Sequence, residues 1–174
     1  PEKLCSDFLF NGLNINQNIL NKLGEDIAFI IDMEFYNRQP RPEAREVLEY
    51  LKHKNLRMGI ISNVLSKKQV PFCLNIYGLN QYFEVLSLSS ILGKRKPHPD
   101  IFYYAFEKAS VDPSEVIYVG NSPSKDIAGA KNVHVKKTVL IEYFENEDND
   151  VGPEPDYKIK TLRELIPIID EEKI

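Results

Sequence analysis

The segment VIYVGNSPSKDIAGAKN, residues 116–132, decides the fold, because an apolar strand passes through a short polar turn into a helix. The opening VIYVG is a short apolar run of the kind that forms a buried parallel strand. Gly120 permits a sharp backbone turn. Asp126 follows at the start of the helix, where the helix dipole favours a carboxylate. The segment therefore predicts one strand–helix unit of a parallel sheet.

The same alternation of strand and helix extends outward in both directions. Toward the N-terminus, we expect strands at residues 56–62 and 83–88, and helices at 42–51, 67–77 and 99–109. Toward the C-terminus, we expect a fourth strand at 135–141, an edge strand at 157–160, and a helix at 162–169 that bends or ends near Pro167. The pattern predicts an α/β, three-layer Rossmann-like parallel sheet with helices on both faces.

The first 41 residues carry no strand pattern. Residues 14–23 and 25–36 predict two helices separated by Gly24. The second helix is apolar on more than one face, so we expect most of it to be covered. Residue 1 is Pro rather than Met, and we expect the chain to begin downstream of the gene's start.

The composition of the 174 residues is that of a globular domain, with 43% hydrophobic and 28% charged residues. A net charge of -4 argues against a nucleic-acid partner. No apolar run reaches the length of a membrane span, and no signal peptide is visible, so we expect a cytoplasmic protein. No protein partner is evident. Residues 142–156 hold seven acidic and no basic residues, which predicts a solvated loop.

Polar residues follow three successive predicted strands, where ligands bind in parallel α/β sheets. Ser62 and Asn63 follow the first, Lys96 precedes a proline after the second, and Asn121 and Asp126 follow the third. Each has an ordinary structural interpretation as a turn, cap or surface residue. Together they predict a site that gathers a phosphate and a divalent cation.

Three segments resemble the second, third and fourth motifs of the haloacid dehalogenase-like hydrolases. They are MGIISN at 58–63, KRKPHPDIF at 94–102, and the segment at 116–132. The resemblance covers residues 42 to 165 with the order and spacing of that family.

The resemblance implies a Mg²⁺-dependent phosphatase that hydrolyses a small phosphorylated metabolite through an aspartyl-phosphate. Ser62, Asn63 and Lys96 would contact the phosphoryl group. Lys96 would also be catalytic, because it would steady the nucleophile. Asp126 and Asn121 would hold Mg²⁺. Asn121 stands where many relatives carry Asp. Unlike Asp, the side chain of Asn121 brings no charge to the metal.

The first motif of the family, DxDxT, does not occur in the chain. The nearest candidate begins at Asp32, but its surroundings predict helix, and Phe35 and Tyr36 follow where a small residue and Thr are needed. We therefore expect residues 1–41 to be the remainder of a helical cap and 42–174 to be the α/β core. The first strand and its nucleophile would lie upstream of Pro1, and the printed chain alone would be inactive.

Other functions remain open at this point. A phosphomutase would use the same motifs, and a dehalogenase arranges its fourth motif differently. A nucleophile-lacking member could also act as a binding or regulatory module. The sequence upstream of Pro1 would discriminate between the enzymes and the module.

Overall fold

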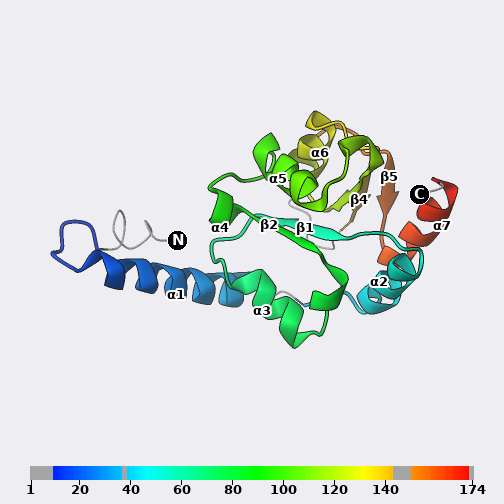
Figure 1. Ribbon diagram of the computed structural model, residues 1–174. Coiled ribbons are helices and arrows are strands. Elements are labelled where there is room, and N and C mark those ends of the chain that lie inside the picture. Colours follow the sequence, from blue (N-terminus) through cyan, green and yellow to red (C-terminus); the bar gives the residue numbers. More distant parts are fainter. Residues whose placement is uncertain (1–9, 37–38, 143–149, 173–174) are drawn as a thin grey trace.

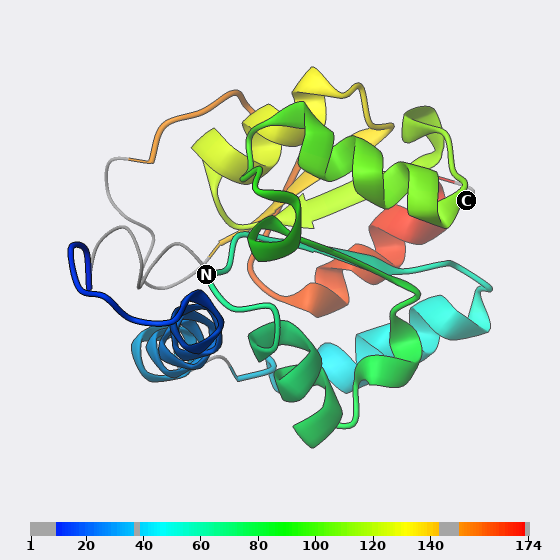
Figure 2. The ribbon, with the colours of Figure 1, turned by 60° about the vertical axis from the view of Figure 1, so that its left-hand side comes forward.

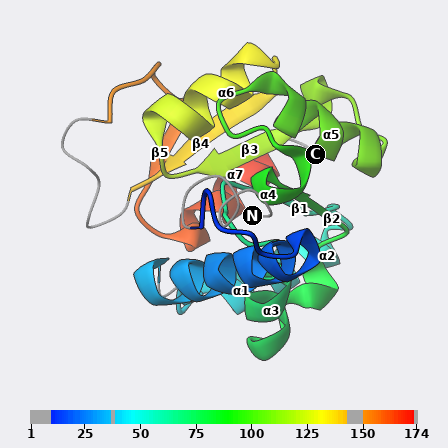
Figure 3. The same ribbon diagram turned by 90° about the vertical axis from the view of Figure 1, so that its left-hand side faces the viewer.

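Parallel strands form the centre of the protein, and they divide into two sheets. The computed structural model describes residues 10–36, 39–142 and 150–172. In the first sheet, β1 (Gly59–Ser62) pairs with β2 (Val85–Leu88). In the second, the order is β3 (Ile117–Gly120), β4 (Lys137–Ile141) and β5 (Tyr157–Ile159). Figure 3 presents the strands across the molecule as β5, β4, β3, β1 and β2.

Helices cover both faces of the sheets (Figures 1 and 2). On one face, α5 (Pro99–Ala109) and α6 (Ala128–Asn132) bury an apolar cluster with β2 and β3. On the other, α2 (Ala44–His53) and α7 (Leu165–Glu171) pack on β4 and β5. Each helix places one apolar face on the sheets, which is the arrangement that buries both faces of parallel strands.

The remaining elements connect these layers. The helix α3 (Gln69–Ile76) follows β1, and the single turn α4 (Ser89–Leu92) follows β2. Short turns complete the chain: η2 (Asn80–Tyr82), η3 (Pro113–Glu115), the π-helical turn η4 (Pro123–Ile127) and η5 (Leu162–Glu164).

The predicted strands and core helices are confirmed, with ends shifted by a few residues. The helix predicted at residues 99–109 is α5 without any shift. The prediction that a helix bends or ends near Pro167 is wrong, because Pro167 lies in the first turn of α7, which continues to Glu171. A proline is tolerated there because the first amides of a helix have no intrahelical acceptor.

The N-terminal region differs from the two predicted helices. It forms one continuous helix, α1 (Gln17–Tyr36), with Gly24 buried inside it. A helix tolerates one interior glycine at a cost of about 1 kcal/mol. The α1 helix extends away from the sheets (Figure 1). Within residues 25–34 only Ile30 and Glu34 are exposed, so the expected coverage of this stretch is confirmed for most of its described side chains and fails at Ile30, which is 57% exposed.

Contacts with α3 hold α1 to the core. The Phe29 ring meets the Phe72 ring edge-to-face, with 5.3 Å between centroids. Glu25 and Asp32 of α1 accept hydrogen bonds from the loop before α3. Within the described residues, no helix is both long and apolar enough to cross a bilayer.

Close packing between α5 and α6 depends on Gly129. A Cβ atom at this position would lie 2.5 Å from the ring of Phe102, which is itself fully buried. We expect Gly129→Ala to lower the free energy of unfolding by about 1–3 kcal/mol, measured by urea denaturation, because the buried ring has little room to move. Adding Phe102→Leu to this variant should lower the free energy of unfolding by less than the same change does in the wild type. Additive losses would contradict the close contact.

Candidate active site

The polar residues predicted at the strand ends gather at one edge of the two sheets. Ser62 ends β1 and is buried, and Asn63 follows it. After the end of β3, Asn121 lies before η4 and Asp126 lies within it. Lys96 lies in the turn before α5 and reaches both strand ends with its side chain. The tertiary structure thus brings four of the predicted residues into one network, namely Asn63, Lys96, Asn121 and Asp126.

A buried ion pair between Lys96 and Asp126 forms the centre of this network. The Nζ atom of Lys96 lies 2.6 Å from Oδ1 of Asp126, and the two side chains are 13% and 4% exposed. The same ammonium donates to the carbonyl of Ile61 at 2.9 Å and to the Tyr118 hydroxyl at 3.2 Å. Because an ammonium has three N–H donors, these acceptors use all of its donor capacity.

The Asp126 carboxylate is similarly saturated. Oδ2 accepts from the amides of Asn121 and Ser122 at 3.1 and 3.0 Å. Oδ1 accepts from the Tyr118 hydroxyl at 2.9 Å, in addition to Lys96. Gly120 makes the arrangement possible, because a Cβ atom there would lie 2.4 Å from the side chain of Asp126. The glycine is therefore required for space beside the carboxylate.

Sequence reasoning did not identify Tyr118 as part of the site. Its ring packs against Phe102, with 5.3 Å between centroids, and its hydroxyl donates to Asp126. Burial, and then the nearby Asp126 carboxylate, raise the pKa of Tyr118 well above its usual value, so the phenol stays protonated. The available signal was a tyrosine in an aliphatic strand, because a buried phenol requires a hydrogen-bond partner.

Asn63 holds the backbone of Lys96 in place. Its Nδ2 donates to the Lys96 carbonyl at 3.1 Å, and its Oδ1 accepts from the Lys96 amide at 2.8 Å. Both ends of the amide side chain are therefore engaged with the turn that carries the lysine. His98 is the N-cap of α5, where its side chain accepts a hydrogen bond from the amide of Asp100.

The polar residues at the strand ends do not by themselves form a divalent metal site. Asp126 already accepts four hydrogen bonds, and Asn121 contributes only a neutral, exposed amide. No cluster of three or more His, Cys, Asp or Glu side chains suited to a metal occurs in the described part of the chain. Because Mg²⁺ is usually held by carboxylates together with water and substrate phosphates, this donor set lacks an available carboxylate.

Asp32, the nearest sequence candidate for a nucleophile, is not at a strand end. It lies in α1, fully buried, and its Oδ2 accepts from the amides of Leu65 and Ser66 at 2.9 and 2.7 Å. The helical interpretation of this segment is therefore confirmed. The carboxylate anchors α1 to the loop that follows Asn63.

A second residue that the sequence did not identify is Asp150. Its carboxylate accepts from the Ser122 hydroxyl at 2.6 Å and from the Ser124 amide at 3.0 Å. Although burial alone would raise it, these bonds hold the pKa of Asp150 below its ordinary value. Gly152 then packs against the backbone of Pro123, where a Cβ atom would lie at 2.3 Å.

The prediction of a solvated acidic loop is thus wrong for two of its members. Asp150 fixes η4, and Asp156 accepts from the amide and hydroxyl of Thr138 at 2.8 and 2.6 Å. Residues 143–149 of this segment lie outside the described residues. Asp150 and Asp156 bind backbone and hydroxyl donors, whereas Glu154 is exposed and pairs with Lys158.

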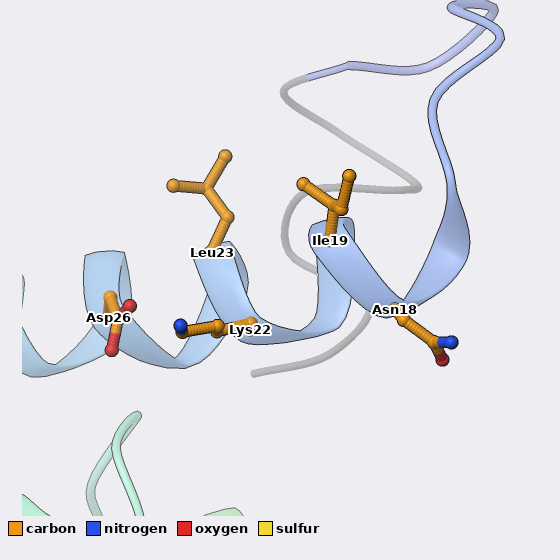
Figure 4. Close-up of a pocket in the computed structure, with 5 residues that line it drawn as sticks. All are labelled: Asn18, Ile19, Lys22, Leu23 and Asp26. Carbon is orange, nitrogen blue, oxygen red and sulfur yellow. The ribbon is translucent and has the colours of Figure 1, made fainter.

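A surface hollow of about 470 Å³ lies on α1 (Figure 4). All of its lining residues come from the first half of α1: Asn18, Ile19, Lys22, Leu23 and Asp26. None of the predicted phosphate or metal residues faces it. The hollow therefore does not belong to the candidate active site.

Comparison with known proteins gives a consistent result. The sequence pattern of a family described as haloacid dehalogenase-like hydrolase matches residues 11–140. A glyceraldehyde 3-phosphate phosphatase from Pyrococcus furiosus is 33% identical over 168 residues, which cover 95% of this chain and 69% of that protein. A phosphoglycolate phosphatase from Pseudomonas fluorescens is 32% identical over 127 residues, or 72% of this chain and 46% of that protein.

A solved structure agrees with these relatives. The crystal structure of a HAD phosphatase from Thermococcus onnurineus has a TM-score of 0.67 and 30% identity, over 93% of this chain and 68% of that one. The chain spans 60% of the length of the glyceraldehyde 3-phosphate phosphatase from Methanopyrus kandleri.

The buried pair makes a strong prediction about stability. We expect Lys96→Met to lower the free energy of unfolding by about 3–5 kcal/mol, because it leaves the Asp126 carboxylate buried without a countercharge. The double variant Lys96→Met/Asp126→Asn should lose less free energy of unfolding than the two single variants lose in sum. Urea denaturation of the four proteins gives the coupling, and strict additivity would contradict the ion pair.

The contribution of Asp150 should depend on pH. Because its folded pKa lies below the ordinary pKa of an aspartate, its stabilising effect is present above that ordinary pKa and is lost as pH falls through the folded pKa. We therefore expect Asp150→Ala to be less stable than the wild type at neutral pH, with a difference that shrinks in acid. Denaturation over a pH series measures this. A difference that stays constant would show that the carboxylate charge is irrelevant.

Proposed function

The chain belongs to the haloacid dehalogenase-like hydrolases, and from this premise we propose that its whole protein hydrolyses the phosphate monoester of a small metabolite. The observation that carries the proposal is the buried Lys96–Asp126 pair at the ends of β1 and β3. A fixed cation at this edge is the group that phosphoryl transfer requires to stabilise developing charge. The named activities of the relatives support the substrate class.

In the proposed site, Ser62 and Asn63 lie beside the phosphate, and Lys96 supplies its positive charge. The ammonium must exchange one of its present acceptors for the phosphate or for the nucleophile. The carbonyl of Ile61 and the Tyr118 hydroxyl are neutral acceptors, so an anion would replace either one favourably. Asn63 would then act by holding the backbone of Lys96 in place.

The nucleophile of this proposal is an aspartate that the given chain does not contain, in line with the lack of a DxDxT motif in its sequence. Asp32 is engaged with backbone amides, and Asp126 is engaged with Lys96. A carboxylate nucleophile would form an aspartyl-phosphate that water then hydrolyses. We accordingly interpret residues 1–41 as the remainder of a cap and 42–174 as the core that the nucleophile joins.

Mg²⁺ is the cofactor that we propose for the complete site. Its binding would require a carboxylate beyond Asp126, whose oxygens are saturated, and Asn121 would contribute at most a neutral oxygen. Without that further carboxylate, the metal supports no catalytic step in this chain alone. We expect the chain by itself to bind Mg²⁺ too weakly for saturation at millimolar concentrations.

One observation favours a second candidate, a binding module without catalysis. In this chain the charges of Lys96 and Asp126 neutralise each other, and every donor of the ammonium has an acceptor. A member of the family without a nucleophile would keep such a pair and could bind a phosphate ester without cleaving it. Titration with inorganic phosphate, together with an assay for turnover, separates the two functions.

The proposal is tested with p-nitrophenyl phosphate. We expect the full-length gene product to release phosphate with Mg²⁺ and to stop when a chelator is added, whereas the printed chain alone should be inactive. Lys96→Ala should lower kcat/KM at least about a hundredfold, the loss typical of one charge-stabilising group. The exposed neighbour provides the control, because Lys94→Ala should leave the rate near normal. Absence of turnover in the full-length protein would overturn the enzyme proposal.

A further inference from the structure

Three buried acceptor atoms at the contact between α1 and α3 have no hydrogen-bond partner. They are Oε2 of Glu25, Oδ1 of Asp32 and Oε1 of Gln69, and the described part of the chain has no other unpartnered buried side-chain nitrogen or oxygen. The side chains of Asp32 and Gln69 are fully buried. Because folded proteins pair nearly all of their buried polar atoms, three unpartnered oxygens at one contact indicate a place that binds a ligand.

Both carboxylates bind one short segment, residues 65–67, which leads into α3. Oδ2 of Asp32 accepts from two amides of this segment, at 2.9 and 2.7 Å. Oε1 of Glu25 accepts from its third amide at 2.9 Å and from the Ser66 hydroxyl at 2.6 Å. Gln69 follows as the first residue of α3, which lies beside the second half of α1 (Figures 1 and 3). Each carboxylate therefore uses one oxygen on the segment and leaves the other unpartnered.

The three unpartnered oxygens cannot satisfy one another, because all are acceptors. An ionised carboxylate has no hydrogen to donate, and neither has the carbonyl end of a glutamine amide. The donor end of the Gln69 side chain is directed toward Sγ of Cys73, at 3.7 Å. One water molecule has only two hydrogens and could not bond all three oxygens. A cation can be held by three oxygens at once.

The charge of the contact also favours a cation. A carboxylate that is removed from water is costly unless a positive charge lies close to it. The amides of residues 65–67 offset only part of this cost, because they are dipoles rather than full charges. The ammonium of Lys68, which follows this segment, bonds Asp26 at 3.0 Å, where both side chains are about half exposed. The ligand of the contact should therefore carry positive charge.

We propose that Glu25, Asp32 and Gln69 bind a calcium ion, which stabilises the contact of α1 with the loop before α3. Carboxylates and amide carbonyls are the oxygen ligands that Ca²⁺ takes, and water or backbone carbonyls would complete its coordination. Mg²⁺ fits less well, because it keeps several of its own waters and these three oxygens are buried. The proposal goes beyond the proposed hydrolysis, since none of the three residues belongs to the candidate active site.

Titration of the chelator-treated protein with CaCl₂ supplies the first test. Calorimetry should show one calcium ion bound per chain, with a Kd of about 0.1–1 mM, the range of weak calcium sites. The amides of residues 65–67 donate to α1 and exchange only when the contact opens. At a calcium concentration ten times Kd, their hydrogen exchange should therefore slow about tenfold. No binding, or binding without this slowing, would overturn the proposal.

The variant Asp32→Asn tests the site without removing the contact. Its amide oxygen can still accept from the backbone, while its NH₂ group can donate to the other unpartnered oxygens. We expect calcium binding to be lost, and the urea midpoint without calcium to equal or exceed that of the wild type. The matched control is Asp26→Asn, a half-exposed acid of the same helix, which should keep the wild-type Kd. Calcium binding that survives in Asp32→Asn would place the ion elsewhere, for example on the acidic segment 142–156, and would contradict the proposal.

The variant Gln69→Glu tests the third ligand by a gain of affinity. A third carboxylate should tighten calcium binding about tenfold, because the charge of the ligands tunes the affinity of such sites. Without calcium, the same variant should have a lower urea midpoint than the wild type, because it adds a buried charge. A purely structural role of Gln69 predicts the loss of stability without the gain in affinity. Weaker calcium binding in this variant would show that the amide acts as a donor, and the proposal would fail.

A last comparison separates this site from the candidate active site. The variant Asn121→Ala should leave the Kd for calcium unchanged, because Asn121 follows β3 and takes no part in the α1 contact. Mg²⁺ should bind at least about tenfold more weakly than Ca²⁺. Loss of calcium binding in Asn121→Ala, or equal affinity for the two ions, would assign the ion to the strand ends and overturn the proposal.

Discussion

The buried pair of Lys96 and Asp126 is the constraint on which the arrangement of the strand ends depends. Two opposite charges that lie out of water must remain close, because separating them leaves each with an uncompensated desolvation cost. This requirement connects the turn before α5 to η4, because Nζ of Lys96 lies 2.6 Å from Oδ1 of Asp126. Tyr118, Asn63 and Gly120 then provide the hydroxyl, the backbone clamp and the space that the pair requires.

The split sheet can persist because the helices hold it from both faces. The cluster around α5 buries apolar side chains from strands of both sheets, and the cluster around α2 and α7 buries those of β3, β4 and β5. This burial stabilises the layer, in which no ladder joins β1 to β3 among the described residues. It does not satisfy the edges themselves, and the half-exposed isoleucines of β1 reflect this. The pair therefore lies at the carboxyl ends of β1 and β3, which belong to different sheets.

Carboxylates have structural roles around the site that composition alone conceals. Asp32 accepts from two amides before α3, Asp150 binds the serines of η4, and Asp156 holds the start of β4. In each case an anion accepts from backbone N–H or hydroxyl donors. Such charge-assisted bonds are stronger than neutral ones. The acidic residues near the site thus fix loops that the apolar clusters do not reach.

The sequence by itself determined the family, the succession of parallel strands and covering helices along the chain, and the residues at the strand ends. These features are local, because apolar periodicity, proline and glycine positions and short motifs each involve residues that are close in sequence. The tertiary structure decided that Gly24 does not end α1, that Tyr118 and Asp150 join the site, and that the sheet divides at β1 and β3. These outcomes depend on contacts between residues distant in sequence, whose burial and pairing no local pattern specifies.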